Sequence, residues 1–190
     1  MKPFNLLLPL LAMSLPGVAL AHAGANHVHG FAAGFTHPLL GVDHLLVMLA
    51  VGLWSAQQGG QRIWLWPVAF VLAMLGGSLL GMAGLQLSWL ETGIATTVLL
   101  LGLLVAATAR LPVFAGAAVC AAMAVLHGMA HGAELPADTD AAIYGLGFMA
   151  ATLLLNSAGV GLARVARYRP LVLRLAGGGV ALTGAGLLLG

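Results

Sequence analysis

Long apolar runs separated by short polar breaks dominate the sequence. Six such runs can be counted, at roughly 34–56, 63–83, 92–109, 113–133, 141–163 and 171–190. Each is close to the length of roughly 20 apolar residues that a helix needs to cross a bilayer. Because the hydrocarbon core offers no water to backbone groups, runs of this length must be helices that satisfy their own hydrogen bonds. The pattern predicts an all-α integral membrane protein, a bundle of about six transmembrane helices.

The first segment has the pattern of a secretory signal peptide rather than of a membrane span. Lys2 precedes a leucine-rich stretch, and the small-residue ending at 19–21 is typical of a cleavage site. Prolines interrupt the stretch, which is also short for a span, so an uncleaved first helix is the weaker alternative. We therefore expect residues 1–21 to be removed. Residues 22–190 then form a single transmembrane helical domain with a short, histidine-bearing periplasmic segment at its start.

Composition agrees with a membrane protein and excludes several other classes. Of the 190 residues, 61% are hydrophobic and only 6% are charged, and the mean hydropathy is +1.05. Seven basic residues and a formal net charge of +2 are too few to follow a nucleic-acid backbone, so we expect no nucleic-acid partner. The lone cysteine, Cys120, excludes an intrachain disulfide framework and a cysteine-based zinc site.

The charged residues predict how the chain is oriented in the bilayer. With the amino-terminal segment outside, the polar breaks alternate between the two sides of the membrane. The arginines then all lie on the cytoplasmic side, as the positive-inside rule requires. They are Arg62, Arg110, Arg164, Arg167, Arg169 and Arg174, whereas Glu91, Glu134, Asp138 and Asp140 fall outside. We expect a multi-pass protein of a bacterial inner membrane with a periplasmic mature amino terminus.

An acidic residue flanked by two histidines opens the first apolar run, in the stretch HPLLGVDH. An acidic side chain at a bilayer centre costs roughly 2.5 to 3.5 kcal/mol, and such residues usually face a bundle interior or a water-filled path. His37 and His44 are seven residues apart, which on one continuous helix places them two turns apart on nearly one face. Asp43 lies beside His44. The stretch predicts a polar path or a ligand site inside the bundle.

The fourth run carries a second set of ionisable residues, in the stretch LHGMAHGAE. His127, His131 and Glu134 stand at positions i, i+4 and i+7, which form one stripe of a helix. Two histidines at this spacing can chelate one ion, and imidazoles with a carboxylate suit a divalent metal such as nickel, cobalt or zinc. Counted by helix rise, His44 and His127 reach the same depth. We therefore expect the two sets to form one metal site.

The amino-terminal segment adds histidines close to this level. His22 follows the expected cleavage point, so its free amine and its imidazole can together chelate one metal ion. His27 and His29 lie in the same segment. Histidine-bearing segments of this length are often inert, and both interpretations stay open for these two residues.

The two stretches resemble the motifs of the HupE/UreJ family. HPLLGVDH has the His-x5-Asp-His pattern, and LHGMAHGAE nearly has the Phe-His-Gly-x-Ala-His-Gly-x-Glu pattern, with Leu126 in place of the phenylalanine. The likeness extends to the leader, the histidine after it and the hydrophobic layout. It implies a function in nickel or cobalt uptake for hydrogenase and urease. It also implies the functional residues His37, Asp43, His44, His127, His131 and Glu134.

We expect a secondary permease or selective channel that imports Ni²⁺, or Co²⁺, from periplasm to cytoplasm. The ion is the transported ligand, with no permanently bound cofactor and no enzymatic activity. The predicted metal ligands are His22, His37, Asp43, His44, His127, His131 and Glu134. The chain has no Gly-x4-Gly-Lys-Ser/Thr loop for ATP.

Two other classes of function remain open from the sequence. The first is an intramembrane metalloenzyme or haem protein, since histidines on helices also hold zinc and haem. Gly128 stands where His-Glu-x-x-His proteases carry their general base, which disfavours zinc hydrolysis. The second is a metal sensor or accessory subunit that binds the ion without carrying it across the bilayer.

Overall fold

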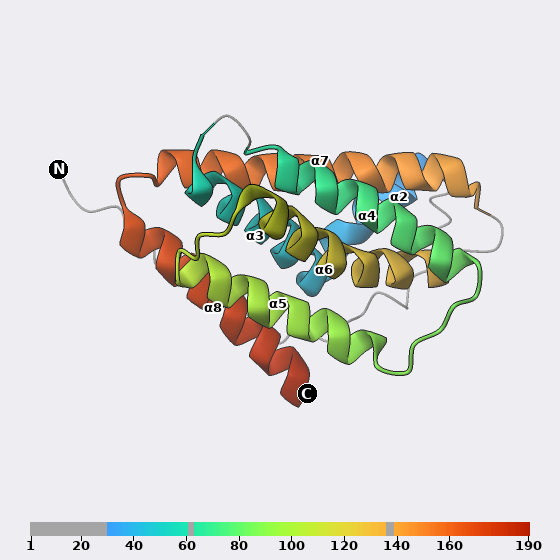
Figure 1. Ribbon diagram of the computed structural model, residues 1–190. Helices are drawn as coiled ribbons and strands as arrows, with labels where there is room; N and C mark the ends of the chain where they lie inside the picture. The colour runs from blue at the N-terminus through green and yellow to red at the C-terminus, as the bar shows by residue number, and fades with distance from the viewer. Residues whose placement is uncertain (1–29, 61–62, 136–138) are drawn as a thin grey trace.

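The computed structural model describes residues 30–60, 63–135 and 139–190. These residues form only helices: α2 (Phe31–Leu40), α3 (Val42–Gln58), α4 (Leu65–Met82), α5 (Leu90–Ala106), α6 (Val113–Ala133), α7 (Ala141–Val165) and α8 (Pro170–Leu189). They pack into one bundle (Figure 1). The predicted all-α class is confirmed. The expected leader and His22, His27 and His29 lie outside the described residues.

Each predicted apolar run is helical, although the runs differ in how well they suit a membrane span. By length and composition, α4, α6, α7 and α8 can each cross a membrane. Helix α5 is apolar but has only 17 residues. Helices α2 and α3 qualify only as a bent pair, so four helices, or five spans if that pair counts as one, are long and apolar enough to cross a membrane among the described residues.

The first predicted span is not one continuous helix, and this part of the prediction is wrong. Helices α2 and α3 are bent by 87° at the residue between them, Gly41, which is extended at φ −85° and ψ 117°. Pro38 inside α2 donates no backbone hydrogen bond and so weakens the last turn before the break. A Cβ at position 41 would lie 2.9 Å from Asp43 Oδ1, so the turn also needs the space that glycine leaves. His37 and His44 therefore lie on different helices.

Three sets of helices pack with their backbones in contact. Helix α4 packs mainly on α6, α5 packs mainly on α8, and α7 packs on both α2 and α3. A Cβ added to Gly77 of α4 would lie 2.2 Å from the backbone oxygen of Val125 in α6. Added Cβ atoms would come equally close to backbone at Gly102, Gly177 and Gly184 in the α5–α8 contact, and at Gly34, Gly52, Gly147 and Gly159 in the contacts of α7. Small residues permit this approach in membrane helices.

Gly77→Ala is expected to destabilise the protein by about 1 to 3 kcal/mol, the usual cost of overpacking. The new methyl group would meet backbone atoms of α6, which cannot move aside without separating the two helices. The neighbouring Gly76 provides a matched control, because nothing lies within 4 Å of a Cβ added there. Unfolding of both variants in mixed micelles, titrated with denaturing detergent, measures the difference. Equal stability of Gly77→Ala and Gly76→Ala would contradict the close packing of α4 and α6.

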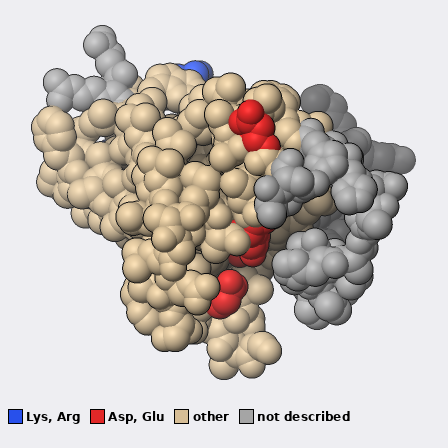
Figure 2. Space-filling model, turned by 90° about the vertical axis from the view of Figure 1, so that its right-hand side faces the viewer, with Lys and Arg blue, Asp and Glu red and all other residues tan. Residues whose placement is uncertain are grey.

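The two ends of the bundle differ in charge. The α5–α6 and α7–α8 connections lie at one end (Figure 1, left), which carries Arg110, Arg164, Arg167 and Arg169 and is called the arginine end. The α4–α5 and α6–α7 connections lie at the other end, which carries Glu91, Glu134 and Asp140 and is called the acidic end. Figure 2 looks onto the acidic end, where acidic side chains face the viewer and basic ones are almost absent. Arg62 and Asp138 lie outside the described residues, and the charged residues named above are sorted between the two ends as the sequence predicts.

Candidate metal site

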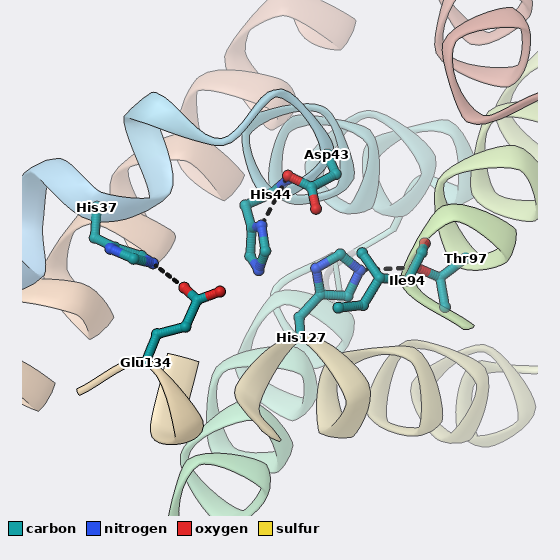
Figure 3. Close-up of polar contacts among 7 residues, drawn as sticks. All are labelled: His37, Asp43, His44, Ile94, Thr97, His127 and Glu134. Carbon is teal, nitrogen blue, oxygen red and sulfur yellow. Dashed lines mark hydrogen bonds and ion pairs between the residues drawn. The ribbon is translucent and has the colours of Figure 1, made fainter. Parts of the chain in front are cut away.

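The four histidines predicted inside the spans meet in the bundle interior, beside the break between α2 and α3. The ring centroid of His44 lies 4.2 Å from that of His131 and 4.8 Å from that of His127. The His37 ring lies 4.7 Å from the His131 ring. Figure 3 shows how His37 and His44 approach α6 from the two helices that flank the bend. The two sequence stretches thus form one cluster, called here the histidine cluster.

The outer part of this cluster is accessible, and its inner part is buried. Glu134 caps the carboxyl end of α6, and its Oε2 lies 3.1 Å from His37 Nε2. These two side chains are 41% and 30% exposed, whereas His131 is 1% exposed and His127 is fully buried. His44 is 8% exposed. Imidazoles therefore lead from the acidic end into the interior without a gap between neighbouring rings.

Four imidazole nitrogens of the histidine cluster have no hydrogen-bond partner within the described part of the chain. They are His44 Nε2, His127 Nδ1 and both ring nitrogens of His131. Buried polar atoms are nearly always paired, and leaving one unpaired costs about 1 to 3 kcal/mol. A nitrogen with a free lone pair is a good ligand for a borderline transition metal. The cluster therefore has the chemistry of a metal site.

The donor atoms are not gathered around one point as the side chains stand. Over residues 30–60, 63–135 and 139–190, no three His, Cys, Asp or Glu side chains form a group that could hold a metal ion. The rings meet edge to face instead, at 86° between His44 and His127 and 61° between His44 and His131. The χ2 torsion of histidine is broad, and bringing three donor nitrogens to one point requires the rings to rotate from these positions.

Asp43 precedes His44 on α3, and its carboxylate lies beside the His44 ring (Figure 3). Its Oδ1 accepts hydrogen bonds from the His44 backbone N–H at 2.8 Å and from the ring Nδ1 at 2.9 Å. Because an ionised carboxylate can only accept, this geometry assigns the ring hydrogen to Nδ1 and leaves the lone pair on Nε2. Asp43 also lies in the first turn of α3, where the helix dipole favours a negative charge. In this arrangement Asp43 orients a ligand and supplies charge.

Thr97 of α5 contacts the histidine cluster although it is not among the predicted site residues. Its Oγ1 lies 2.7 Å from His127 Nε2 and donates to the Ile94 backbone oxygen at 2.7 Å (Figure 3). The neighbouring Thr96 bonds only the backbone of its own helix, at Thr92 O. The sequence places two threonines side by side in an apolar run, and nothing in it tells which one faces a histidine.

Glu91 is a second residue near the site that is not among the predicted metal ligands. It lines a cavity of about 160 Å³ together with Asp43, between α3, α5 and the end of α8. Two carboxylates therefore border the same space at the acidic end. Cys120, by contrast, is fully buried in the apolar core and packs there as a small hydrophobic residue.

The helices and the site define the class of protein: an all-α, multi-pass membrane protein with a buried histidine cluster. The family model of the HupE / UreJ protein matches residues 10–187. The chain is 46% identical over 192 residues to Protein HupE of Rhizobium leguminosarum bv. viciae, and the match covers 100% of both chains. This chain belongs to the HupE/UreJ family. No solved structure matches it.

Proposed function

We propose that the protein is a secondary permease or selective channel that carries Ni²⁺ or Co²⁺ across the membrane for the maturation of metalloenzymes. The observation that carries this proposal is the set of unpaired nitrogens on His44, His127 and His131 in an apolar interior. Neutral imidazoles are ligands that suit nickel and cobalt, whereas magnesium and calcium prefer oxygen. Membership of the HupE/UreJ family supports the same substrate, because the family is associated with uptake of these metals.

The charges around the cluster favour entry of a dication from the acidic end. Glu134 lies at the accessible part of the row of imidazoles, and Asp43 contacts His44 in its buried part. Their negative charges offset part of the hydration that the ion loses on entering a medium of low dielectric constant. A negative-inside membrane potential adds about 4.6 kcal/mol per 100 mV for a double charge.

Toward the arginine end, the row of histidines stops at His127. The Phe70 ring lies 6.4 Å from the His127 ring, and the fully buried residues Met74, Trp54 and Cys120 occupy the core. Phe70 and Trp54 offer no ligand atom, and the sulfur atoms of Met74 and Cys120 are soft ligands set in an apolar core. This arrangement supports a gated passage, in which helices move to open the arginine end.

The charge distribution also supports an orientation in a bacterial inner membrane. We place the acidic end and the mature amino terminus in the periplasm and the arginine end in the cytoplasm, following the positive-inside rule. His22 would then add a chelating amine and imidazole at the entrance. Its position lies outside the described residues, so this role stays a prediction.

Thiol labelling tests the proposed orientation. A cysteine replacing exposed Ser88, at the acidic end, is expected to react with an impermeant thiol reagent in intact spheroplasts. A cysteine replacing Tyr168, which is 80% exposed at the arginine end, should react only after lysis. The buried Cys120 of the unmodified protein gives the background. The reverse labelling pattern would overturn the orientation and the direction of transport.

The competing proposals bind metal without moving it. A haem between His44 and His127 is disfavoured because the two rings are in contact and leave no space for a porphyrin plane between them. A zinc hydrolase is disfavoured because Gly128 follows His127, where a general base would be needed. A metal sensor or accessory subunit would bind the ion at this cluster but show no flux.

Uptake of labelled Ni²⁺ and Co²⁺ into proteoliposomes with an imposed negative-inside potential tests the proposed function. We expect accumulation that rises with the potential and is unaffected by excess Mg²⁺, because Mg²⁺ prefers oxygen ligands. Protein-free liposomes measure the leak. Binding of one ion per chain without accumulation would replace the transport proposal by the sensor or accessory role.

A further inference from the structure

We infer that Thr97 is a positioning residue, which holds the His127 imidazole in one tautomer so that Nδ1 keeps its lone pair for the transported ion. The part of this inference that concerns the ion rests on the proposed function. The part that concerns the tautomer stands on the hydrogen bonds alone. Thr97 is on α5 and His127 is on α6, so the contact joins two helices that otherwise touch little.

The threonine hydroxyl has a single proton, so it can donate only one hydrogen bond. Thr97 Oγ1 has two partners, the Ile94 backbone oxygen and His127 Nε2, each at 2.7 Å. A carbonyl oxygen can only accept, so the hydroxyl proton must point to Ile94 for that bond to form. The remaining partner then has to donate. The bond to His127 therefore requires a hydrogen on Nε2.

The opposite arrangement is less favourable. If the hydroxyl donated to His127 Nε2, the bond to Ile94 would be lost and the ring hydrogen would move to Nδ1. Nδ1 is buried and has no partner among the described residues, so it would become an unpaired donor. One hydrogen bond would replace two, which is the less favourable arrangement in a buried site. The two-bond arrangement leaves Nδ1 as an unprotonated nitrogen.

The second histidine on this side of the cluster is held in the complementary way. Asp43 accepts a hydrogen bond from His44 Nδ1–H, which leaves the lone pair on Nε2. Thr97 accepts a hydrogen bond from His127 Nε2–H, which leaves the lone pair on Nδ1. Figure 3 shows Thr97 on the side of His127 away from His44, with the free nitrogen of His127 on the side of His44. Partners that fix the tautomer of a metal-binding histidine are a general feature of metal sites.

Burial makes the threonine the deciding partner. Thr97 is 5% exposed and His127 is fully buried, so bulk water does not compete for Nε2. Thr97→Val preserves the shape of the side chain and removes the hydroxyl, whereas Thr97→Ser keeps the hydroxyl. Thr152→Val is the matched control, since Thr152 is also fully buried and bonds only the Phe148 backbone oxygen at 2.9 Å.

The first measurement is the tautomer of His127 in the metal-free protein, read from the ¹⁵N chemical shifts of its ring after labelling with ¹⁵N-histidine. A His127→Gln variant assigns the signals. We expect a hydrogen on Nε2 in the unmodified protein, in Thr97→Ser and in Thr152→Val, and a mixture of tautomers in Thr97→Val. A hydrogen on Nδ1 in the unmodified protein overturns the inference, and this result does not depend on how any variant at position 97 folds.

The second measurement is Co²⁺ binding, followed by the visible absorption of the bound ion. Thr97→Val should weaken Co²⁺ binding about 10- to 100-fold, as loss of such supporting partners does elsewhere, while Thr97→Ser and Thr152→Val should bind nearly as the unmodified protein does. An unchanged tautomer or unchanged Co²⁺ affinity in Thr97→Val overturns the positioning role. Absence of Co²⁺ binding in the unmodified protein overturns the proposed function instead, and the ring shifts still decide the tautomer.

Discussion

Replacing both His44 and His127 by alanine is expected to reduce nickel uptake little more than replacing either one. Each single substitution should lower the initial rate at least about tenfold, because even the outer partners of metal ligands are worth 10- to 100-fold. The two rings lie 4.8 Å apart and come from different helices, so one ion can use both. Groups that act as a unit give strongly non-additive effects when they are removed together.

The measurement is a double-mutant cycle on initial uptake rates in proteoliposomes, normalised to the amount of folded protein. Cys120→Ala serves as the control, because Cys120 is equally buried in the core and lies outside the histidine cluster; it should retain most uptake. Two independent packing histidines would show additive losses. Full activity of His127→Ala at normal abundance would remove the basis for a shared site.

Asp43→Asn is expected to lower nickel uptake nearly as much as the single alanine substitutions at His44 and His127, although aspartate and asparagine have almost the same shape. An amide oxygen can still accept from the His44 backbone and ring, so the main loss is the negative charge beside the site. Two unit charges 4 Å apart interact by about 4 kcal/mol at an effective dielectric constant of 20, and the ion carries a double charge. Even at a larger separation, the loss should exceed the 1.4 kcal/mol that corresponds to tenfold.

Asp140→Asn is the matched control for this charge. Asp140 caps the start of α7 through the backbone N–H groups of Ala142 and Ile143, and asparagine caps helices equally well. It should transport nickel normally. Initial rates at several nickel concentrations separate weaker binding from slower translocation. If Asp43→Asn transported both metals at the unmodified rate, the electrostatic role of Asp43 would have to be abandoned.

The all-helical class was readable from the sequence because a membrane leaves the backbone few choices. Apolar runs of spanning length have to be helices, and their polar breaks mark the connections. The break at Gly41 was not predicted, although Pro38 and Gly41 both lie in that run. Membrane helices tolerate both residue types, so the sequence does not distinguish a kink from an 87° turn.

Local spacing predicted which histidines lie together, whereas the contacts between helices determine what each ring touches. The i and i+4 spacing of His127 and His131 follows from helix geometry, and their convergence with His44 was expected from depth. The contact of Thr97 with His127 depends on how α5 lies against α6. The spacing of residues along the sequence does not predict this packing. Asp43 is adjacent to His44 in sequence, yet the sequence does not show that its carboxylate contacts the His44 ring nitrogen.

Close packing at glycines divides the bundle into sets of helices, and the site residues are distributed over three of these sets. Where backbones touch, no layer of side chains lies between helices, so α4 with α6, α5 with α8, and α7 with α2 and α3 each form a closely packed unit. His127 belongs to the first unit, Thr97 to the second and His44 to the third. The contacts among His44, His127 and Thr97 therefore lie where the three units meet. A tilt of one unit that opened the arginine end would also separate these three side chains. The movement that opens the passage would therefore weaken ion binding at the same time.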